Sequence, residues 1–296
     1  MNFNEKIIIG SVHFGMPYGL KEGKESCTSK IEIKKILSIA RNNKILNIDT
    51  AMNYGKAEKN LGVCGVNGFK IISKIYIEQN ILDLEQYIFS QIETTLNNLG
   101  VNSLQGLLVH NPTALLSEQG KRIYSYLLKA KEIYKINKIG ISAHHFYEIK
   151  PIIKKFKIDI VQLPFNVFDQ RAIKNKLFNY FKSNKIEIHA RSIFLQGLLL
   201  YSTNELPEQF LKWKSLFHKF DNFVKNYNIS KLEACINYVN SFKEIDKFVV
   251  GIRETKELEK ILSVKIKKLG QLSSDFASND LSLIDPSNWK KINFNK

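Results

Sequence analysis

Eight short runs rich in β-branched residues recur along the chain, and helical patterns separate them. The strand candidates are residues 6–10, 44–49, 69–74, 104–110, 138–142, 158–163, 185–189 and 248–251. The clearest helical pattern spaces mostly apolar side chains by three and four residues, at Leu84, Tyr87, Ile88, Ile92, Thr95, Leu96 and Leu99. Strands that alternate with helices through short connections build a parallel sheet with right-handed crossovers. The pattern therefore predicts the α/β class.

The number of units distinguishes between two parallel architectures. Eight units in roughly 260 residues fit a (β/α)8 TIM barrel better than a doubly wound sheet. The dinucleotide fingerprint of a doubly wound sheet is missing, because the glycines of Gly10-Ser11-Val12-His13-Phe14-Gly15 have the wrong spacing. No Pro- or Gly-rich linker divides the chain, so we expect one barrel domain over residues 1–296. From about residue 267 the periodicity fades, and we expect an irregular tail across the barrel or the pocket mouth.

Composition narrows the partners and the compartment. Taken alone, the net charge of +16 suggests nucleic acid or an anionic membrane as a partner. The lysines are scattered along helical stretches without a dense basic block, however, so we expect neither, although the field favours small anionic ligands. No run of about 18 apolar residues is present, and the polar start without a cleavage site predicts no signal peptide. The three cysteines show no CxxC spacing, which indicates a cytoplasmic protein.

Four chemically active residues follow successive strand candidates. Asp49 ends the second run, Tyr54 comes five residues later, Lys74 ends the third and His110 ends the fourth. Active sites of barrels lie at the carboxyl ends of the strands, so these side chains are expected to face one cavity. An acid, a phenol, an amine and an imidazole can together protonate a carbonyl oxygen while a hydride reaches its carbon.

The roles follow from ordinary acid–base chemistry. Tyrosine titrates near 10, and a lysine ammonium beside the hydroxyl favours the phenolate. Asp49 can hold Lys74 in place and keep it charged, while His110 hydrogen-bonds the carbonyl oxygen. General acid catalysis of this kind contributes about 10² to 10⁴ in rate. Because no side chain donates a hydride, a nicotinamide cofactor is required.

The stretch Asp49-Thr50-Ala-x-x-Tyr54-Gly55, followed by Glu58 and Leu61-Gly62, resembles the aldo-keto reductase family. The likeness runs from Gly10 to 249–253. It implies that Tyr54 is the general acid, that Lys74 and Asp49 support it, and that His110 orients the carbonyl. The activity it implies is NAD(P)H-dependent interconversion of an alcohol and a carbonyl, which is an aldehyde, a ketone or a sugar derivative.

The resemblance also implies a set of cofactor contacts. The carboxamide contacts fall on Ser142 and Gln162, although Ala143 replaces the family's asparagine and Arg191 replaces its stacking aromatic residue. The remaining predicted contacts run under the pyrophosphate and around the adenosine: Ser192, Phe194, Leu195, Gln196, Gly197, Gly251, Arg253 and Glu257. Arg253 and Lys256 favour a 2′-phosphate, whereas Glu257 would repel it. We expect NADP rather than NAD.

The substrate pocket is expected to be built from the first loop, at His13, Phe14, Met16 and Tyr18, with Trp289 from the tail. The segment 188–199 resembles a subgroup associated with bacterial sugar and surface-polysaccharide metabolism. It extends the predicted substrates to a sugar or a sugar nucleotide. We expect a monomer or a small homo-oligomer.

Other functions stay open at this level. A barrel of this family with Ala143 and Arg191 could serve as a nicotinamide-nucleotide sensor or auxiliary subunit with little turnover. A nucleic-acid binder rests on the net charge alone. The adjacent His144 and His145 would point apart, and no His-x-His pair ends a strand, so we expect no metal.

Overall fold

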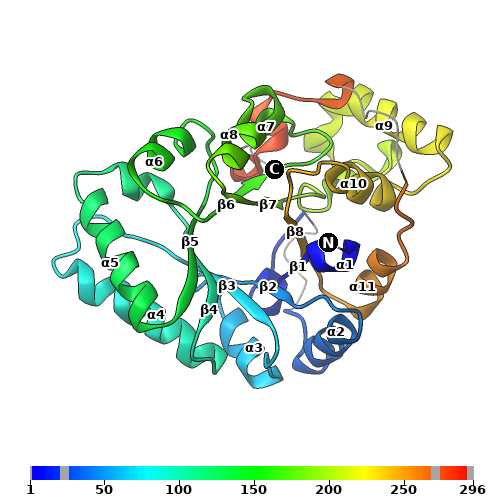
Figure 1. The fold of residues 1–296 in the computed structure, drawn as a ribbon. Helices are drawn as coiled ribbons and strands as arrows, with labels where there is room; N and C mark the ends of the chain where they lie inside the picture. Colours follow the sequence, from blue (N-terminus) through cyan, green and yellow to red (C-terminus); the bar gives the residue numbers. More distant parts are fainter. Residues whose placement is uncertain (1, 21–26, 268–273, 292–296) are drawn as a thin grey trace.

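The computed structural model describes residues 2–20, 27–267 and 274–291. Its eight strands pair in parallel and in chain order around a closed barrel (Figure 1): β1 Ile7–Gly10, β2 Asn47–Asp49, β3 Lys70–Ile75, β4 Leu104–Val109, β5 Ile136–Ser142, β6 Ile160–Pro164, β7 Glu187–Arg191 and β8 Lys247–Gly251. β1 pairs with both β2 and β8, which closes the ring and leaves no edge strand. The (β/α)8 prediction is confirmed.

Helices surround the barrel (Figure 1). The α-helices are α1 Phe3–Lys6, α2 Lys30–Asn42, α3 Ala57–Cys64, α4 Leu84–Leu99, α5 Gly120–Ile133, α6 Ile149–Lys155, α7 Arg171–Lys174, α8 Leu177–Ser183, α9 Lys214–Asn226, α10 Lys231–Asn240, α11 Thr255–Leu262 and α12 Leu281–Ile284. Short 3-10 helices occupy Val12–Phe14, Pro112–Leu116, Leu198–Leu200, Thr203–Glu205, Glu208–Trp213, Ser274–Phe276 and Pro286–Lys291. None of the helices in the described ranges has the length and hydropathy of a bilayer crossing.

Local sequence explains where α4 and α10 begin and end. The carboxylate of Asp83 caps α4 by accepting the Gln86 N–H at 3.0 Å, and Gly100 ends the helix in the left-handed conformation at φ 65°. At the start of α10, Ser230 and Glu233 satisfy each other's backbone N–H groups in a capping box. The predicted amphipathic helix over Leu84–Leu99 is therefore confirmed.

β2 and β7 are among the predicted strands that begin later than expected. Lys44 and Lys185 have φ values of 61° and 56°, a conformation that strand residues do not adopt. β2 therefore starts at Asn47 and β7 at Glu187. β7 also runs two residues further than predicted, so that Arg191 is its last residue.

The barrel interior holds an apolar layer directly below the functional one. Ile8, Ile72, Leu108 and Ile160 pack together at the centre. Side chains repeat every second residue along a strand, so Lys74, His110 and Gln162 lie one layer above Ile72, Leu108 and Ile160. The larger apolar cluster lies between the strands and the helices.

The described part of the tail is not wholly irregular, since 274–291 contains α12 and two 3-10 turns. Trp289 does not reach the pocket that the first loop lines. Its ring lies 4.9 Å from that of Phe210, and its Nε1–H donates to the carbonyl of Leu283 at 3.0 Å. Residues 268–273 and 292–296 lie outside the described residues.

Candidate active site

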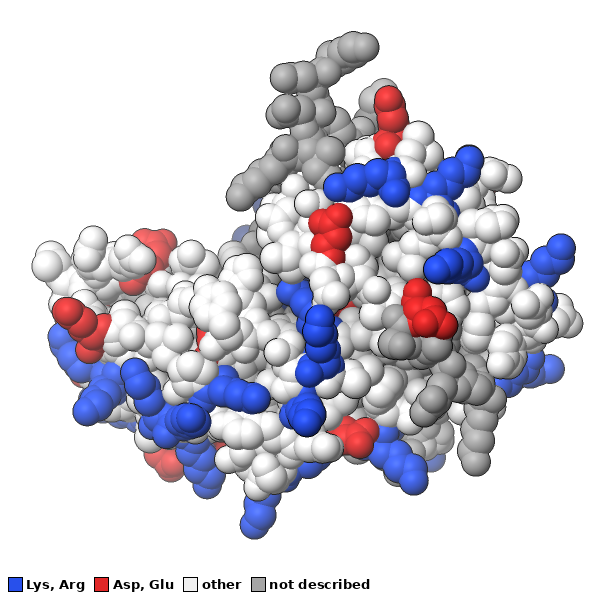
Figure 2. All heavy atoms as spheres, turned by 90° about the horizontal axis from the view of Figure 1, so that it is seen from above, with Lys and Arg blue, Asp and Glu red and all other residues white. Residues whose placement is uncertain are grey.

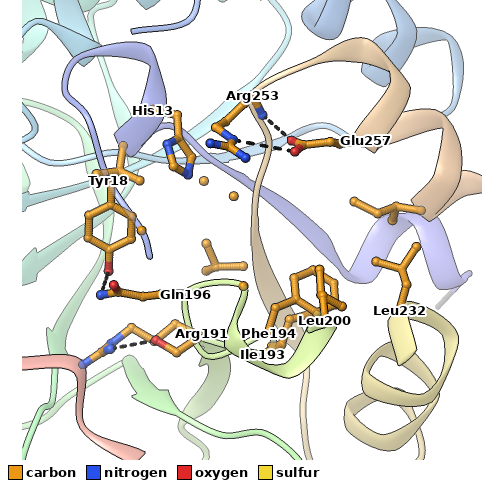
Figure 3. Close-up of a pocket in the computed structure, with 18 of the residues that line it drawn as sticks. His13, Tyr18, Arg191, Ile193, Phe194, Gln196, Leu200, Leu232, Arg253 and Glu257 are labelled. Carbon is orange, nitrogen blue, oxygen red and sulfur yellow. Dashed lines mark hydrogen bonds and ion pairs between the residues drawn. The ribbon is translucent and has the colours of Figure 1, made fainter. Parts of the chain in front are cut away.

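A cavity of about 1190 Å³ opens at the carboxyl ends of the strands. It brings together most of the predicted site residues, namely Asp49, Tyr54, His110, Ser142, Gln162, Arg191, Ser192, Phe194, Gln196, Gly197, Gly251, Arg253, Glu257, His13 and Tyr18. Figure 3 labels His13, Tyr18, Arg191, Phe194, Gln196, Arg253 and Glu257. Lys74 lies just beneath its wall and is 1% exposed. Residues that line the cavity run from the barrel centre to Val264, just beyond the end of α11.

Lys74 uses all three of its ammonium hydrogens. Its Nζ donates to Oδ1 of Asp49 at 2.5 Å, to the carbonyl of Thr50 at 2.9 Å and to Oη of Tyr54 at 3.5 Å. Burial lowers the pKa of Lys74, but the contacts with Asp49 and then Tyr54 outweigh it, and the net pKa is raised. The ammonium therefore stays charged beside the phenol.

A close backbone contact positions Tyr54. Gly15 lies against the turn that follows β2, where an added Cβ would come within 2.0 Å of the Tyr54 carbonyl oxygen. The Gly15 carbonyl accepts the N–H of Lys56 at 3.2 Å. Since no side chain other than hydrogen fits at this position, Gly15 fixes the turn and directs the half-buried phenol into the cavity.

His110 is neutral and held by a neighbour of Tyr54. Burial, followed by the charge of Lys74, lowers the pKa of His110 to about 2. Its Nδ1 lies 3.0 Å from the side-chain amide of Asn53. The amide oxygen would accept from an Nδ1–H, whereas the amide nitrogen, turned to the ring, would donate to a bare Nδ1 and leave the single imidazole proton on Nε2. The Tyr54 and His110 rings meet edge to face at 5.9 Å. Asn53 was not among the predicted site residues.

Gln162 joins the predicted carboxamide site to the tetrad, which is the set of Asp49, Tyr54, Lys74 and His110. Its Nε2 donates to Oδ2 of Asp49 at 2.7 Å, and its Oε1 accepts the hydroxyl of Ser142 at 3.4 Å. Asp49 is thus held by Lys74 through one oxygen and by Gln162 through the other. This arrangement fixes the carboxylate that holds the ammonium.

Arg191 reaches across the end of β6 to the residues after β5. Its Nη2 donates to the Ala143 carbonyl and to Nδ1 of His144, both at 3.1 Å, and Nη1 donates to the Ser192 hydroxyl at 3.2 Å. The His144 ring stacks on that of His110 at 6.2 Å. Burial, followed by the charge of Arg191, lowers the pKa of His144 to about 4. Sequence reasoning considered His144 only as a metal ligand and missed its place in this wall.

The opposite end of the cavity has a different character. Arg253 forms an ion pair with Glu257 at 3.7 Å and donates its backbone N–H to the same carboxylate at 2.7 Å (Figure 3). Lys260 lines this end, whereas the expected Lys256 is exposed and does not. Apolar residues that the sequence did not single out complete the wall: Leu200, Leu232, Ile261 and Val264. Their spacing on helices and turns is the same as that of core residues, so no sequence signal marks them.

Tyr18 and Gln196 bridge the first and seventh loops over the cavity (Figure 3). The Gln196 amide donates to the Tyr18 hydroxyl at 3.0 Å. The turn that carries Gln196 is strained, because φ is positive at Ser192, Leu195 and Gln196 as well as at Gly197. Such non-glycine residues cost about 1–3 kcal/mol each and cluster at functional sites.

Three further predicted residues lie outside the cavity lining. Phe14 is fully buried in the core between strands and helices, so it does not form the pocket wall. Met16 is half-buried and outside the cavity lining. The Leu195 side chain is likewise buried in the core, although its backbone belongs to the strained turn. In the described ranges, no three His, Cys, Asp or Glu side chains are placed to hold a metal ion.

Comparison with known proteins agrees with the barrel fold. The profile of the Aldo/keto reductase family matches residues 6–278. A putative aldo-keto reductase from Pseudomonas aeruginosa is 19% identical, with 88% of each chain covered and a TM-score of 0.64. A thermostable aldo-keto reductase in complex with the inhibitor epalrestat is 18% identical, with 90% of this chain and 91% of that chain covered and a TM-score of 0.69. No curated protein sequence matches. With the family profile spanning most of its length, the chain belongs to the aldo-keto reductase family.

Proposed function

We propose that the protein is an NADPH-dependent reductase that converts an aldehyde, a ketone or a sugar derivative into an alcohol, with Tyr54 as the general acid. The observation that carries this proposal is the Lys74 ammonium, which is held by Asp49 and lies 3.5 Å from the Tyr54 hydroxyl. We also propose that the protein acts in the cytoplasm as a monomer or a small homo-oligomer.

The chain's own residues handle the proton. Tyr54 and His110 present their polar atoms to a carbonyl oxygen, and Tyr54 gives up its proton as the alkoxide forms. The Lys74 ammonium stabilises the phenolate that remains, and Asp49 keeps that ammonium charged. Proton donation in this manner supplies about 10² to 10⁴ in rate. When bound, the nicotinamide supplies the hydride.

The donor set of the cavity fits a nicotinamide nucleotide. Two buried polar atoms in its wall lack partners among the described residues: the hydroxyl of Ser11 and Nε of Arg191. Ser142 and Gln162 supply groups for a carboxamide, and we assign the pyrophosphate to the turn 194–197, of which Phe194, Gln196 and Gly197 line the cavity. A cavity of about 1190 Å³ is also larger than most small-molecule pockets.

The choice of NADP over NAD rests on Arg253 and Lys260, two cations at the far end. Glu257 offsets part of this field, since it pairs with Arg253. Figure 2 shows one face of the molecule, over which Lys and Arg side chains are spread with acidic residues between them. The net charge of +16 thus supports small anionic ligands such as sugar phosphates or sugar nucleotides rather than nucleic acid.

Titration of the protein with NADPH and NADH, followed by a panel of aldehydes, ketones and sugars, tests the proposal. We expect tighter binding of NADPH and its oxidation with at least one carbonyl. The second candidate is a nucleotide sensor, which the position of Arg191 against Ala143 and His144 favours. Tight binding without consumption across the panel would support the sensor.

A further inference from the structure

Arg191 brings a positive charge to the cavity wall without a described carboxylate in hydrogen-bond contact. Within the described ranges its guanidinium contacts only neutral groups, which are the Ser192 hydroxyl, the Ala143 carbonyl and His144 Nδ1. Its Nε is buried and has no hydrogen-bond partner there. Arg191 is half-buried, and arginines withdrawn from water are usually paired with a carboxylate, so this arrangement requires a reason.

The nearby carboxylates have partners of their own. Glu148 accepts the N–H groups of His144 and His145 at 3.1 and 3.2 Å. Asp169 pairs with Arg171 at 2.7 Å. Asp285 accepts from the hydroxyl of Ser287 at 2.7 Å. Glu148 and Asp169 interact with Arg191 and reduce its field. None of the three lines the cavity, however, so the charged side chain that a ligand meets at this wall is that of Arg191.

The other ionisable groups at this end add little net charge. Lys74 and Asp49 neutralise each other at 2.5 Å. Burial lowers the pKa of His13 to about 4, of His110 to about 2 and of His144 to about 4, so the three imidazoles are uncharged near neutral pH.

Arg191 lies on the side of the cavity where we expect the reacting part of a cofactor. A hydride donor has to approach within about 3–3.5 Å of the carbonyl carbon, whose oxygen faces Tyr54 and His110. The His110 ring is 6.2 Å from that of His144, and His144 Nδ1 is 3.1 Å from Arg191. Pro164 and Arg191 are paired at the ends of β6 and β7, beside Gln162.

A reduced nicotinamide ring is neutral, whereas the oxidised ring carries a positive charge. We propose that Arg191 makes this cavity bind the reduced nicotinamide nucleotide more tightly than the oxidised one, which favours loading of the reduced form and release of the oxidised one. The inference rests on the proposed function. A partly solvated pair of like charges gives roughly a tenfold preference, which corresponds to a rise of about 30 mV in the potential of the bound couple.

The test measures dissociation constants rather than turnover. NADPH and NADP⁺ are titrated into the wild-type chain, Arg191→Gln and Arg191→Lys, with folding checked by thermal denaturation. We expect roughly tenfold tighter binding of NADPH to the wild type. Arg191→Gln should bring the two constants to within about threefold, mainly through tighter NADP⁺ binding, while Arg191→Lys, which keeps the charge, should retain the preference.

A ligand without the ring separates a ring effect from a phosphate contact. Arg191→Gln should leave the affinity for 2′-phospho-ADP-ribose unchanged. Equal weakening of all three ligands would show that Arg191 binds phosphate and would overturn the inference. Equal affinity of the wild type for NADPH and NADP⁺ would also overturn it, even if no variant folds. Absence of nucleotide binding would instead refute the proposed function, and this inference with it.

Discussion

Gln162 donates its side-chain amide to Oδ2 of Asp49 at 2.7 Å, while Lys74 holds the other oxygen of the same carboxylate. A residue expected to contact the cofactor therefore belongs to the network that supports proton donation. Any ligand group that recruits the Gln162 amide competes with Asp49 for it. Ligand binding is thereby coupled to the position of Asp49, and through Asp49 to that of Lys74.

Replacing this amide with an acid tests the coupling. Gln162→Glu places a second carboxyl against Asp49, and two such groups cannot both ionise at hydrogen-bond distance. We expect kcat/KM for carbonyl reduction to fall by about 10- to 100-fold, with the largest loss at high pH. A pH profile of kcat/KM for this variant measures it, and Gln162→Met is the uncharged control. A profile equal to that of the control would contradict the coupling.

The buried ion pair predicts a separation of stability from activity. Lys74→Met leaves Asp49 uncompensated at 3% exposure, and breaking such a pair from one side costs about 3–5 kcal/mol. The double variant Lys74→Met/Asp49→Leu should recover most of the free energy of unfolding, because both charges are gone. It should not recover reductase activity. Urea denaturation measures the stabilities, and an equally unstable double variant would rule this explanation out.

Asn53 is predicted to set the tautomer of His110. Because the imidazole is neutral, it has one proton, and the contact at Nδ1 decides whether Nε2 can donate. The Asn53 amide can turn its nitrogen to donate to Nδ1, which leaves the proton on Nε2. Asn53→Asp presents only acceptors, so it should hold the proton on Nδ1 and lower kcat/KM by about tenfold or more. Nitrogen-15 NMR of the imidazole reads the tautomer directly. Asn53→Ser is the matched neutral variant, and an unchanged tautomer in Asn53→Asp would disprove this role.

Acid sensitivity should follow from the histidines of the cavity. His13, His110 and His144 have pKa values lowered to about 4, 2 and 4 in the folded protein, whereas an unfolded histidine titrates near 6.5. Below that value the unfolded chain binds more protons, so stability is complete above about pH 6.5 and is lost as the pH falls toward the folded values. Each proton contributes a slope of about 1.4 kcal/mol per pH unit. Urea midpoints between pH 7 and 4.5 measure the slope, and His144→Asn should reduce it; an equal slope would contradict this assignment.

Much of this architecture could be predicted because strand and helix periodicities are local. The alternation identified the barrel, and the strand-end positions of Asp49 and His110 identified one face of it. The start of β7 was missed because the left-handed turn at Lys185 has no glycine to mark it. Phe14 was misplaced because a 3-10 turn, not an extended loop, turns its side chain into the core.

The remaining site residues depend on tertiary contacts. Asn53 acts on His110 across 57 residues, and Arg191 meets His144 across 47. No periodicity or motif in a single sequence encodes such pairs. The Gln162–Asp49 contact spans 113 residues, and only closure of the barrel brings its two strands face to face.

The most direct test of the account is the Tyr54→Phe variant, measured for both turnover and NADPH binding. Removing one hydroxyl leaves the ring packing and the cavity wall in place while the proton donor is lost. We expect kcat to fall by about 10² to 10⁴, with the dissociation constant for NADPH changed by less than about twofold. Turnover equal to that of the wild type, on a carbonyl that the wild type reduces, would contradict the role of Tyr54 as the acid.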